Sequence, residues 1–279
     1  MENIITAEQI DAYCLSLLAD ERAAGTISKY RRDLTAFALW LDGRAVTKET
    51  AAGWKSHLSQ QGYAPRTVNS MLASLNSFCR FAGLPIKVKF LKIQRQIFRD
   101  SAKELTKEEY DRLLTAVREG GQERLALIME TLCATGIRVS ELRYITVEAA
   151  KAGRATITLK GKIRTILLST KLCRKLVKYA KKQKIASGEI FLTKSGRPIT
   201  RRQVWYELKR LCKAAGVEPT KVFPHNLRHL FATTFYRVCR DIVRLADVLG
   251  HSSIDTTRIY LMVSGAEQQR QLDRLGLVS

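Results

Sequence analysis

The chain has 279 residues, 46% of them hydrophobic, so it is long enough to bury two cores of unequal size. Its 48 Lys and Arg residues against 26 Asp and Glu residues leave a formal net charge of +22, which predicts a polyanionic partner, above all nucleic acid. No stretch approaches the roughly 20 apolar residues of a membrane span, and the N-terminus lacks the basic and apolar regions of a signal peptide. These features exclude membrane and secreted proteins and predict a cytoplasmic location.

Residues 1–83 have the pattern of a small helical domain. Amphipathic helical segments follow one another between residues 6 and 82, and glycines stand at their ends. The expected helix starts are Thr6, Thr26 or Ser28, Thr47 and Pro65. Residues 84–103 lack helical periodicity, so we expect a basic linker that crosses a phosphate backbone. Its basic side chains include Lys87, Lys89, Lys92, Arg95 and Arg99.

Residues 104–279 are expected to form a second domain. Thr106 and Glu109 make a capping box, which predicts a helix to about Arg118, and a more apolar helix follows from 122 to 135. The strands ATITLK and IRTILLS flank a turn at Gly161 and predict a hairpin. A short strand is expected at 189–193, and further helices at 171–186, 201–215, 224–238, 241–249 and 253–262. The predicted fold is mainly α with a small antiparallel β-sheet.

Candidate phosphate-binding residues lie in this second part, which also holds most of the excess charge. Residues 101–279 carry 34 basic against 17 acidic side chains, whereas residues 1–100 carry 14 against 9. Arg138 follows a helix stop, where a guanidinium can make two parallel bonds to phosphate oxygens; a surface Arg paired with Glu141 is the alternative. His225 and Arg228 lie three residues apart after Pro224, so both can reach one phosphate.

The spacing of His225 and His229 also allows zinc binding as an alternative. A metallohydrolase needs a Glu directly after the first His as general base, and Asn226 stands there instead. No Cys or carboxylate cluster lies nearby in sequence, although His251 is a possible further ligand. The chain also lacks a P-loop and the clustered carboxylates of two-metal nucleases, so neither a metal nor ATP is expected as a cofactor.

Four segments of the chain together resemble the catalytic boxes of the tyrosine recombinase, or phage integrase, family of XerC/XerD-like enzymes. In chain order they are CATGIRVSEL (133–142), the LKGKIRTILL hairpin, FPHNLRHLFATTF (223–235) and VLGHSSIDTTRIYLM (248–262). The resemblance covers residues 106–262, and the N-terminal helices look like the core-binding domain of that family. It implies a two-domain architecture, a helical core-binding domain plus an α+β catalytic domain.

The resemblance also implies an activity and a set of catalytic residues. A site-specific recombinase of this family cuts and rejoins double-stranded DNA through a 3′-phosphotyrosine intermediate and a Holliday junction, as a tetramer. The residues that match its motifs are Arg138, Lys160, His225, Arg228, His251 and the nucleophile Tyr260. Lys160 would protonate the leaving 5′ oxygen from a hairpin tip, and Lys162 is the alternative because the hairpin is about one residue shorter than usual in the family.

Tyr260 is chosen among nine tyrosines by its position nine residues after His251 in the last box. A lone Tyr on such a helix is more often a core anchor. A phenol with a pKa near 10 is a poor nucleophile at neutral pH, so it needs nearby cations and a proton acceptor. Arg138, Arg228 and His225 would supply them.

Other basic side chains are candidates for DNA contacts, although a charge run is often only a solvated face. They are Lys29, Arg31, Arg32 and Arg66 in the N-terminal helices, Lys162 in the hairpin, and Arg201 and Arg202 at a helix start after SGRPIT. The tail from 265 to 279 is amphipathic and is expected to dock on a neighbouring subunit through Leu272, Leu275 and Leu277.

Two alternatives to recombination follow from the same residues. One is a nicking and resealing enzyme similar to type IB topoisomerases, which would relax DNA without exchanging strands. The other is a DNA-binding regulator that has lost catalysis, against which the complete set of catalytic residue types argues.

Overall fold

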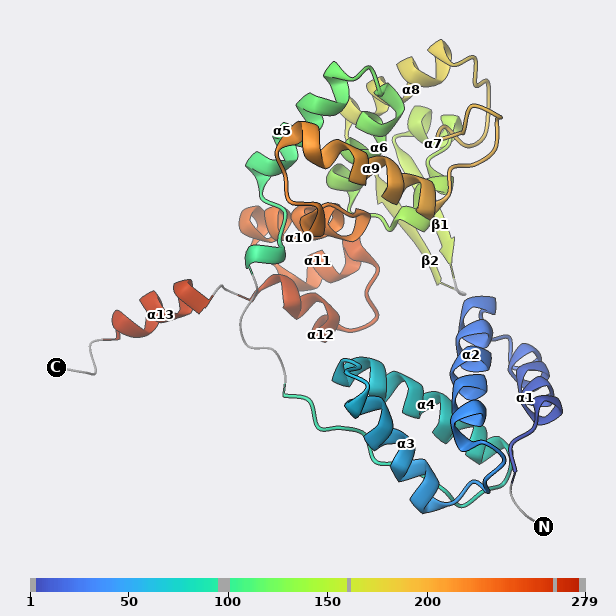
Figure 1. The fold of residues 1–279 in the computed structure, drawn as a ribbon. Helices are drawn as coiled ribbons and strands as arrows, with labels where there is room; N and C mark the ends of the chain where they lie inside the picture. Colours follow the sequence, from blue (N-terminus) through green and yellow to red (C-terminus); the bar gives the residue numbers. More distant parts are fainter. Residues whose placement is uncertain (1–3, 95–100, 160–161, 263–264, 276–279) are drawn as a thin grey trace. The chain divides into compact units, whose positions relative to one another are not determined.

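The computed structural model describes residues 4–94, 101–159, 162–262 and 265–275 (Figure 1). The chain divides into two compact units, Met1–Arg95 and Gln96–Ser279. It is mostly helical, and the strands among its described residues form a two-stranded antiparallel sheet, which confirms the predicted fold class. Within those residues, no helix combines the length and the apolar character that crossing a membrane requires.

The first unit consists of α1 (Ala7–Ala19), α2 (Ala24–Leu41), α3 (Lys48–Gln60) and α4 (Pro65–Phe81). Capping boxes at Thr6 and Thr47 and the Pro at the start of α4 confirm three of the expected starts. The start expected at Thr26 or Ser28 is wrong, because α2 already begins at Ala24 after a cap that makes no side-chain hydrogen bond. The backbone carbonyl of Ala23 there accepts from the N–H groups of Thr26 and Ile27.

The segment after α4 packs on this unit. Val88 is buried in the same core as Phe37 and Phe78. Asn76 makes two hydrogen bonds with the backbone of Val88, and Asn69 makes two with the backbone of Leu91. The first part of the expected linker is therefore held against the helices, with Lys87, Lys89 and Lys92 exposed. Arg95 and Arg99 lie outside the described residues.

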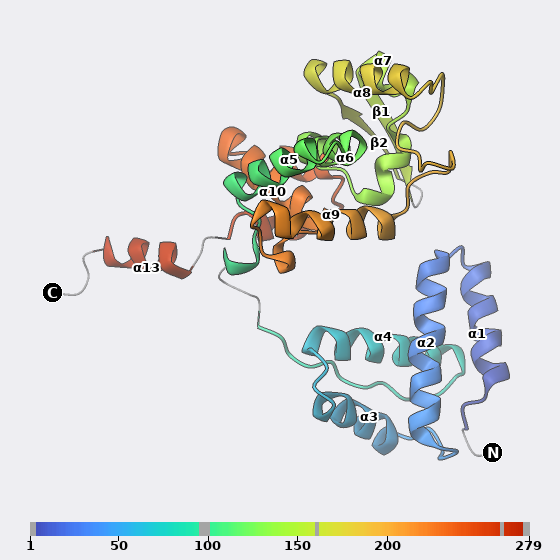
Figure 2. The same cartoon turned by 45° about the horizontal axis from the view of Figure 1, so that its top comes forward.

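The second unit builds its core around α6 (Glu123–Thr135), which packs against α5 (Lys107–Glu119), α8 (Thr170–Lys182) and α10 (Pro224–Cys239). The capping box of Thr106 confirms the predicted start of α5. Strands β1 (Arg154–Leu159) and β2 (Lys162–Leu167) form the predicted hairpin, and α9 (Arg201–Ala215) packs against α5 (Figure 2). The fold continues through α11 (Ile242–Leu249), α12 (Ile254–Thr257) and α13 (Gly265–Asp273).

Three expectations for this unit are wrong in detail. The segment 189–193 makes isolated bridges, from Glu189 to Thr146 and from Leu192 to Pro198, and not a strand, because a turn at Gly196 immediately redirects it. Helix α8 ends at Lys182, four residues early, where the backbone passes through a left-handed Lys184 (φ +56°). The segment expected as one helix over 253–262 divides into α12 and a 3-10 turn, η4 (Arg258–Tyr260). Helix α7 (Val147–Ala152) was not predicted.

Candidate active site

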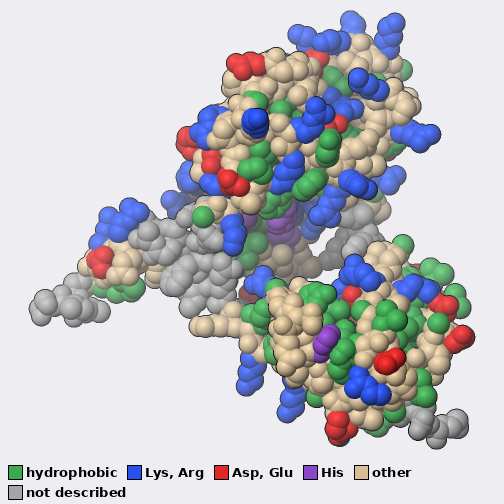
Figure 3. Space-filling view, viewed as in Figure 1, with side chains coloured by type: hydrophobic (Ala, Val, Ile, Leu, Met, Phe, Trp, Pro, Cys, Tyr) green, Lys and Arg blue, Asp and Glu red, His purple; other side chains and the backbone are tan. Residues whose placement is uncertain are grey.

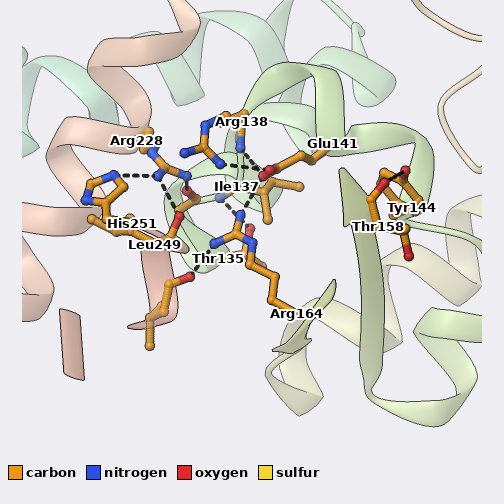
Figure 4. Close-up of polar contacts among 12 residues, drawn as sticks. Thr135, Ile137, Arg138, Glu141, Tyr144, Thr158, Arg164, Arg228, Leu249 and His251 are labelled. Atoms are coloured by element: carbon orange, nitrogen blue, oxygen red, sulfur yellow. Dashed lines mark hydrogen bonds and ion pairs between the residues drawn. The ribbon is translucent and has the colours of Figure 1, made fainter. Parts of the chain in front are cut away.

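Arg138 is positioned by the end of α6. Gly136 ends this helix with φ +63°, and a Cβ there would lie 2.3 Å from the ring of Phe231, so both the backbone angle and the space require glycine. The chain then enters the 3-10 turn η2 (Val139–Tyr144). Glu141 accepts the backbone N–H of Arg138 at 2.7 Å, and its other oxygen lies 3.0 Å from the Arg138 guanidinium (Figure 4).

The Arg138–Glu141 pair bears on both interpretations of Arg138 from the sequence, the phosphate-binding guanidinium and the surface ion pair with Glu141. The side chain of Glu141 is 1% exposed, whereas that of Arg138 is 41% exposed. The carboxylate is thus a buried holder for a guanidinium whose outer side still faces solvent. Such an arrangement orients Arg138 for an anion and leaves it accessible to one.

Arg228 comes from α10 and is almost completely buried, with 2% of its surface exposed. Its guanidinium donates to the carbonyl oxygens of Gly136 and Leu249, the latter at 2.8 Å, and lies 3.0 Å from Nε2 of His251. Burial, followed by the positive charge of Arg138, lowers the pKa of Arg228 to about 10. Among its described hydrogen-bond partners there is no carboxylate, so a cation sits in the interior without a directly bonded counterion.

His251 lies between Arg228 and Thr257. An Arg can only donate, so Nε2 of His251 accepts from Arg228, which leaves the proton on Nδ1 for a 2.8 Å hydrogen bond to Oγ1 of Thr257. Burial, followed by the charges of Arg228, Arg138 and Arg164, lowers the pKa of His251 to about 4. The imidazole is therefore neutral at pH 7.

His225 lies in the first turn of α10, where the structure exposes it. Protein atoms that displace water from the ring lower the pKa of His225, and the charges of Arg228, Arg138 and Arg201 lower it further. A neutral His can accept a proton at pH 7. Next to it, Asn226 donates from Nδ2 to the carbonyl oxygens of Lys103 and Lys221, both at 2.8 Å, so this residue has a structural task.

Tyr260 ends η4 and is buried, with 4% of its surface exposed. Its ring stacks on His251, with ring centres 6.2 Å apart, and makes an edge contact with His229 at 4.8 Å. His229 in turn lies 3.8 Å from a carboxylate oxygen of Glu104. The second His of the H-x3-H motif therefore packs against the candidate nucleophile.

An open cavity of about 590 Å³ adjoins these residues. Arg138, Glu141 and His251 line it, together with Arg164 and Gly250. Four of the predicted catalytic residues, Arg138, Arg228, His251 and Tyr260, are thus linked by contacts around one region of the second unit. Lys160 lies outside the described residues, and Lys162 is the first residue of β2, with its backbone paired to Leu159.

Comparison with known proteins identifies the family of this fold. Residues 103–267 match the model of the phage integrase family, and residues 10–83 match its N-terminal SAM-like domain. The chain belongs to the phage integrase family. It is 30% identical to tyrosine recombinase XerA of Thermococcus kodakarensis, with 97% of this chain and 96% of the relative covered. It is also 32% identical to tyrosine recombinase XerC of Roseiflexus castenholzii, with 91% and 88% covered.

Solved structures of this family share the fold. A XerH site-specific recombinase bound to its difH substrate matches with a TM-score of 0.71 at 18% identity, covering 99% of this chain and 91% of the other. A lambda integrase tetramer bound to a Holliday junction matches with a TM-score of 0.72 at 20% identity, covering 91% and 76%. The protein is a tyrosine recombinase with the N-terminal and catalytic domains of this family.

The candidate DNA contacts of the recombinase differ in their surroundings. Lys29 turns to Asp33, at 2.5 Å, and to Ser70 and Ser74 within the first unit. Arg31 pairs with Asp11, and Arg32 lies 3.3 Å from Asp33 with a side chain that is 75% exposed. Three further candidates are exposed in first turns of helices: Arg66 in α4, and Arg201 and Arg202 in α9. Figure 3 shows Lys and Arg side chains over much of the visible face of the second unit.

Two further residues of the recombinase site were not predicted from the sequence. Arg164 of β2 donates to Glu141 at 2.6 Å and to the carbonyl of Val248 at 2.7 Å, and Thr257 holds His251. Arg164 shares the inward face of the hairpin with Ile166, whereas Ile163 is exposed; the sequence alone does not show which face is inward, because both alternating sets contain apolar residues. A charged residue at such an inward position needs a buried partner. Nothing in the sequence around Thr257 marked it.

Proposed function

We propose that this tyrosine recombinase cuts and rejoins DNA by attack of Tyr260 on a scissile phosphate. The P–O bond to the 5′ oxygen breaks as the bond to the phenol oxygen forms, which yields a 3′-phosphotyrosine and a free 5′ hydroxyl. A 5′ hydroxyl of the partner duplex then attacks the phosphotyrosine, the P–O bond to Tyr260 breaks and releases the phenol, and a Holliday junction results. The observation that carries the proposal is the buried guanidinium of Arg228, which bonds to no carboxylate of the described residues and contacts His251 beside Tyr260.

A phosphate would complete the electrostatics of this region. A buried cation without a counterion is costly, and an anion bound between Arg228 and Arg138 would remove much of that cost. The same two guanidiniums would stabilise the charge that grows on the phosphorane-like transition state. Glu141 would keep Arg138 turned towards the phosphate. Because these cations supply the positive charge, we propose that the reaction needs no metal ion.

The imidazoles would handle protons in different ways. His225, neutral at pH 7, would assist removal of the phenol proton of Tyr260. His251 offers Nε2 to Arg228 in the structure, so a phosphate that takes over this guanidinium would free Nε2, and a change of tautomer would let it donate to a non-bridging oxygen. Lys160, or Lys162, would protonate the leaving 5′ oxygen.

Self-association would involve α13. Leu272 of this helix and Leu275, two residues after its end, are exposed at 50% and 59% of their surface, and Leu277 lies outside the described residues. A largely apolar groove of about 650 Å³, lined by Phe231, Phe235 and Val238 among others, lies on the second unit between α5, α6, α8 and α10. We propose that α13 of one copy docks in this groove of another, as part of a tetramer on two DNA sites in the cytoplasm. The lambda integrase tetramer, which shares the fold, supports such an assembly.

The test is covalent trapping on a nicked suicide substrate in the presence of EDTA. The wild-type chain should form a protein–DNA adduct, and Tyr260→Phe should form none. Tyr236→Phe is the matched control because Tyr236 packs against the same cluster as Tyr260, and it should react like the wild type. An adduct that persists in Tyr260→Phe, or that needs a divalent metal, would contradict the proposal.

The two alternative functions separate in further assays on the same protein. Plasmid relaxation without exchange between two sites would favour a nicking and resealing enzyme. Sequence-specific binding without any adduct would favour a regulator. The target sequence for these assays can be found by footprinting DNA that flanks the gene.

A further inference from the structure

Arg164 occupies a junction between three parts of the catalytic unit. It lies in β2, opposite Ile157 of β1, and its side chain is 16% exposed. One terminal nitrogen donates to Glu141 of η2, and the other donates to the carbonyl of Val248 at the end of α11 (Figure 4). These contacts span 23 and 84 residues of sequence. One guanidinium therefore ties the hairpin to the segments that carry Arg138 and His251.

The first contact bears on Arg138. Glu141 is buried and shared, because one oxygen faces the Arg138 guanidinium and the other accepts both the Arg138 backbone N–H and Arg164. A carboxylate held from two sides keeps a single orientation. Without Arg164, Glu141 would lose its second cation and could rotate towards Arg138. The direction of the Arg138 guanidinium would then no longer be set.

The second contact bears on Arg228 and His251. The last carbonyls of a helix lack partners within the helix. At the end of α11, Arg164 takes the carbonyl of Val248, and Arg228 takes the next carbonyl, that of Leu249. The following Gly250 has φ +64°, and a Cβ there would lie 2.6 Å from Cδ of Arg164. The backbone that leads into His251 therefore rests directly on the Arg164 side chain.

We propose that Arg164 is a positioning residue that sets the spacing between Arg138 and the Arg228–His251 pair, the two halves of the phosphate clamp. This inference rests on the function proposed above. Both outer nitrogens of Arg164 are engaged by protein oxygens, so Arg164 acts through its neighbours and not on the phosphate. A Lys at this position keeps the charge but offers one point of contact in place of a fork, so it cannot hold Glu141 and Val248 together.

The experiment compares Arg164→Lys and Arg164→Ala with Arg154→Ala, an exposed Arg of the same hairpin. Single-turnover cleavage of the suicide substrate should slow by roughly 100-fold in both Arg164 variants, because small displacements of catalytic groups cost about that much. DNA affinity should stay within about threefold, and Arg154→Ala should cleave at the wild-type rate. Added methylguanidinium should raise the cleavage rate of Arg164→Ala at least tenfold and leave the cleavage rate of Arg154→Ala unchanged.

A second substrate distinguishes a displaced phosphate clamp from a loss of proton transfer to the leaving group. A 5′-bridging sulfur at the scissile phosphate leaves as a thiolate and needs no proton. The deficit of Arg164→Lys should persist on this substrate, because the clamp is still displaced; recovery to the wild-type rate would overturn the proposal and assign Arg164 to support of the hairpin lysine. Wild-type rates in both Arg164 variants would also overturn it. The absence of any wild-type adduct would instead refute the proposed function itself.

Discussion

Each unit of the protein holds a cation against buried groups, but only one of the two cations has a carboxylate partner among the described residues: the partly exposed Lys29 of the first unit pairs with a buried Asp33, whereas Arg228 of the second unit is itself buried. In the first unit, Lys29 reaches Asp33 at 2.5 Å, and Ser74 donates to the same carboxylate oxygen at 2.8 Å. In the second unit, Arg228 is 2% exposed and bonds to two carbonyls and an imidazole. The Lys29 charge is satisfied by the fold, whereas the Arg228 charge calls for an anion from outside. A cation that pairs with a buried carboxylate is therefore structural, and a buried cation without a carboxylate partner among the described residues indicates a ligand site.

The largest expected effect follows from changing Arg228. Arg228→Lys keeps a positive charge but loses the fork that reaches the carbonyls and the phosphate, so cleavage should slow by about 1000-fold, as when a transition-state donor is removed. Suicide-substrate cleavage measures the rate. Thermal unfolding of the same sample checks that the variant is folded. If cleavage stays within tenfold of the wild type, the contrast between the two cations is wrong.

Lys29→Met should show the opposite result. It leaves Asp33, which is 4% exposed, without its closest cation, so the free energy of unfolding should fall by about 2 kcal/mol. Urea unfolding measures this change, and Arg32→Met is the matched control because Arg32 touches the same carboxylate from solvent and should cost less than about 1 kcal/mol. At a temperature where the variant is folded, its cleavage rate should match that of the wild type. A slower cleavage step in folded Lys29→Met would show that Lys29 contributes to the reaction and not only to stability.

The smallest effect concerns the pH dependence that burial and the nearby charge of Arg228 give to His251. The pKa of His251 is lowered from 6.5 to about 4 in the folded protein, so between these values the unfolded chain binds the extra proton. Stability from this group is complete above pH 6.5 and is lost as the pH falls towards 4. In His251→Gln, the decrease in unfolding free energy from pH 7 to pH 4.5 should be smaller than in the wild type, by less than about 2 kcal/mol. Equal decreases in the two proteins would show that the pKa of His251 is not lowered in the folded state.

Much of the fold followed from local patterns. The capping boxes of Thr6, Thr47 and Thr106 and the helix stop at Gly136 were predictable because each depends on residues within one or two turns. The hairpin followed from its β-branched residues. Two of the expectations that failed concern short segments: a turn at Gly196 interrupts 189–193, and the segment 253–262 packs against α10 through η4.

The candidate site was also predictable from the sequence only in part. The sequence by itself indicated a set of arginines, histidines and a tyrosine suited to phosphate chemistry. The order and spacing of four motifs indicated the family, because each motif is a short stretch of sequence that can be recognised without the fold. Only the tertiary structure decided which cations find a carboxylate. In the structure, Asp33 pairs with Lys29, Glu141 bonds to both Arg138 and Arg164, and Arg228 donates to carbonyl oxygens. Charge pairing depends on distance and burial in space, and the partners of Arg164 and Arg228 lie 21 to 92 residues away along the chain.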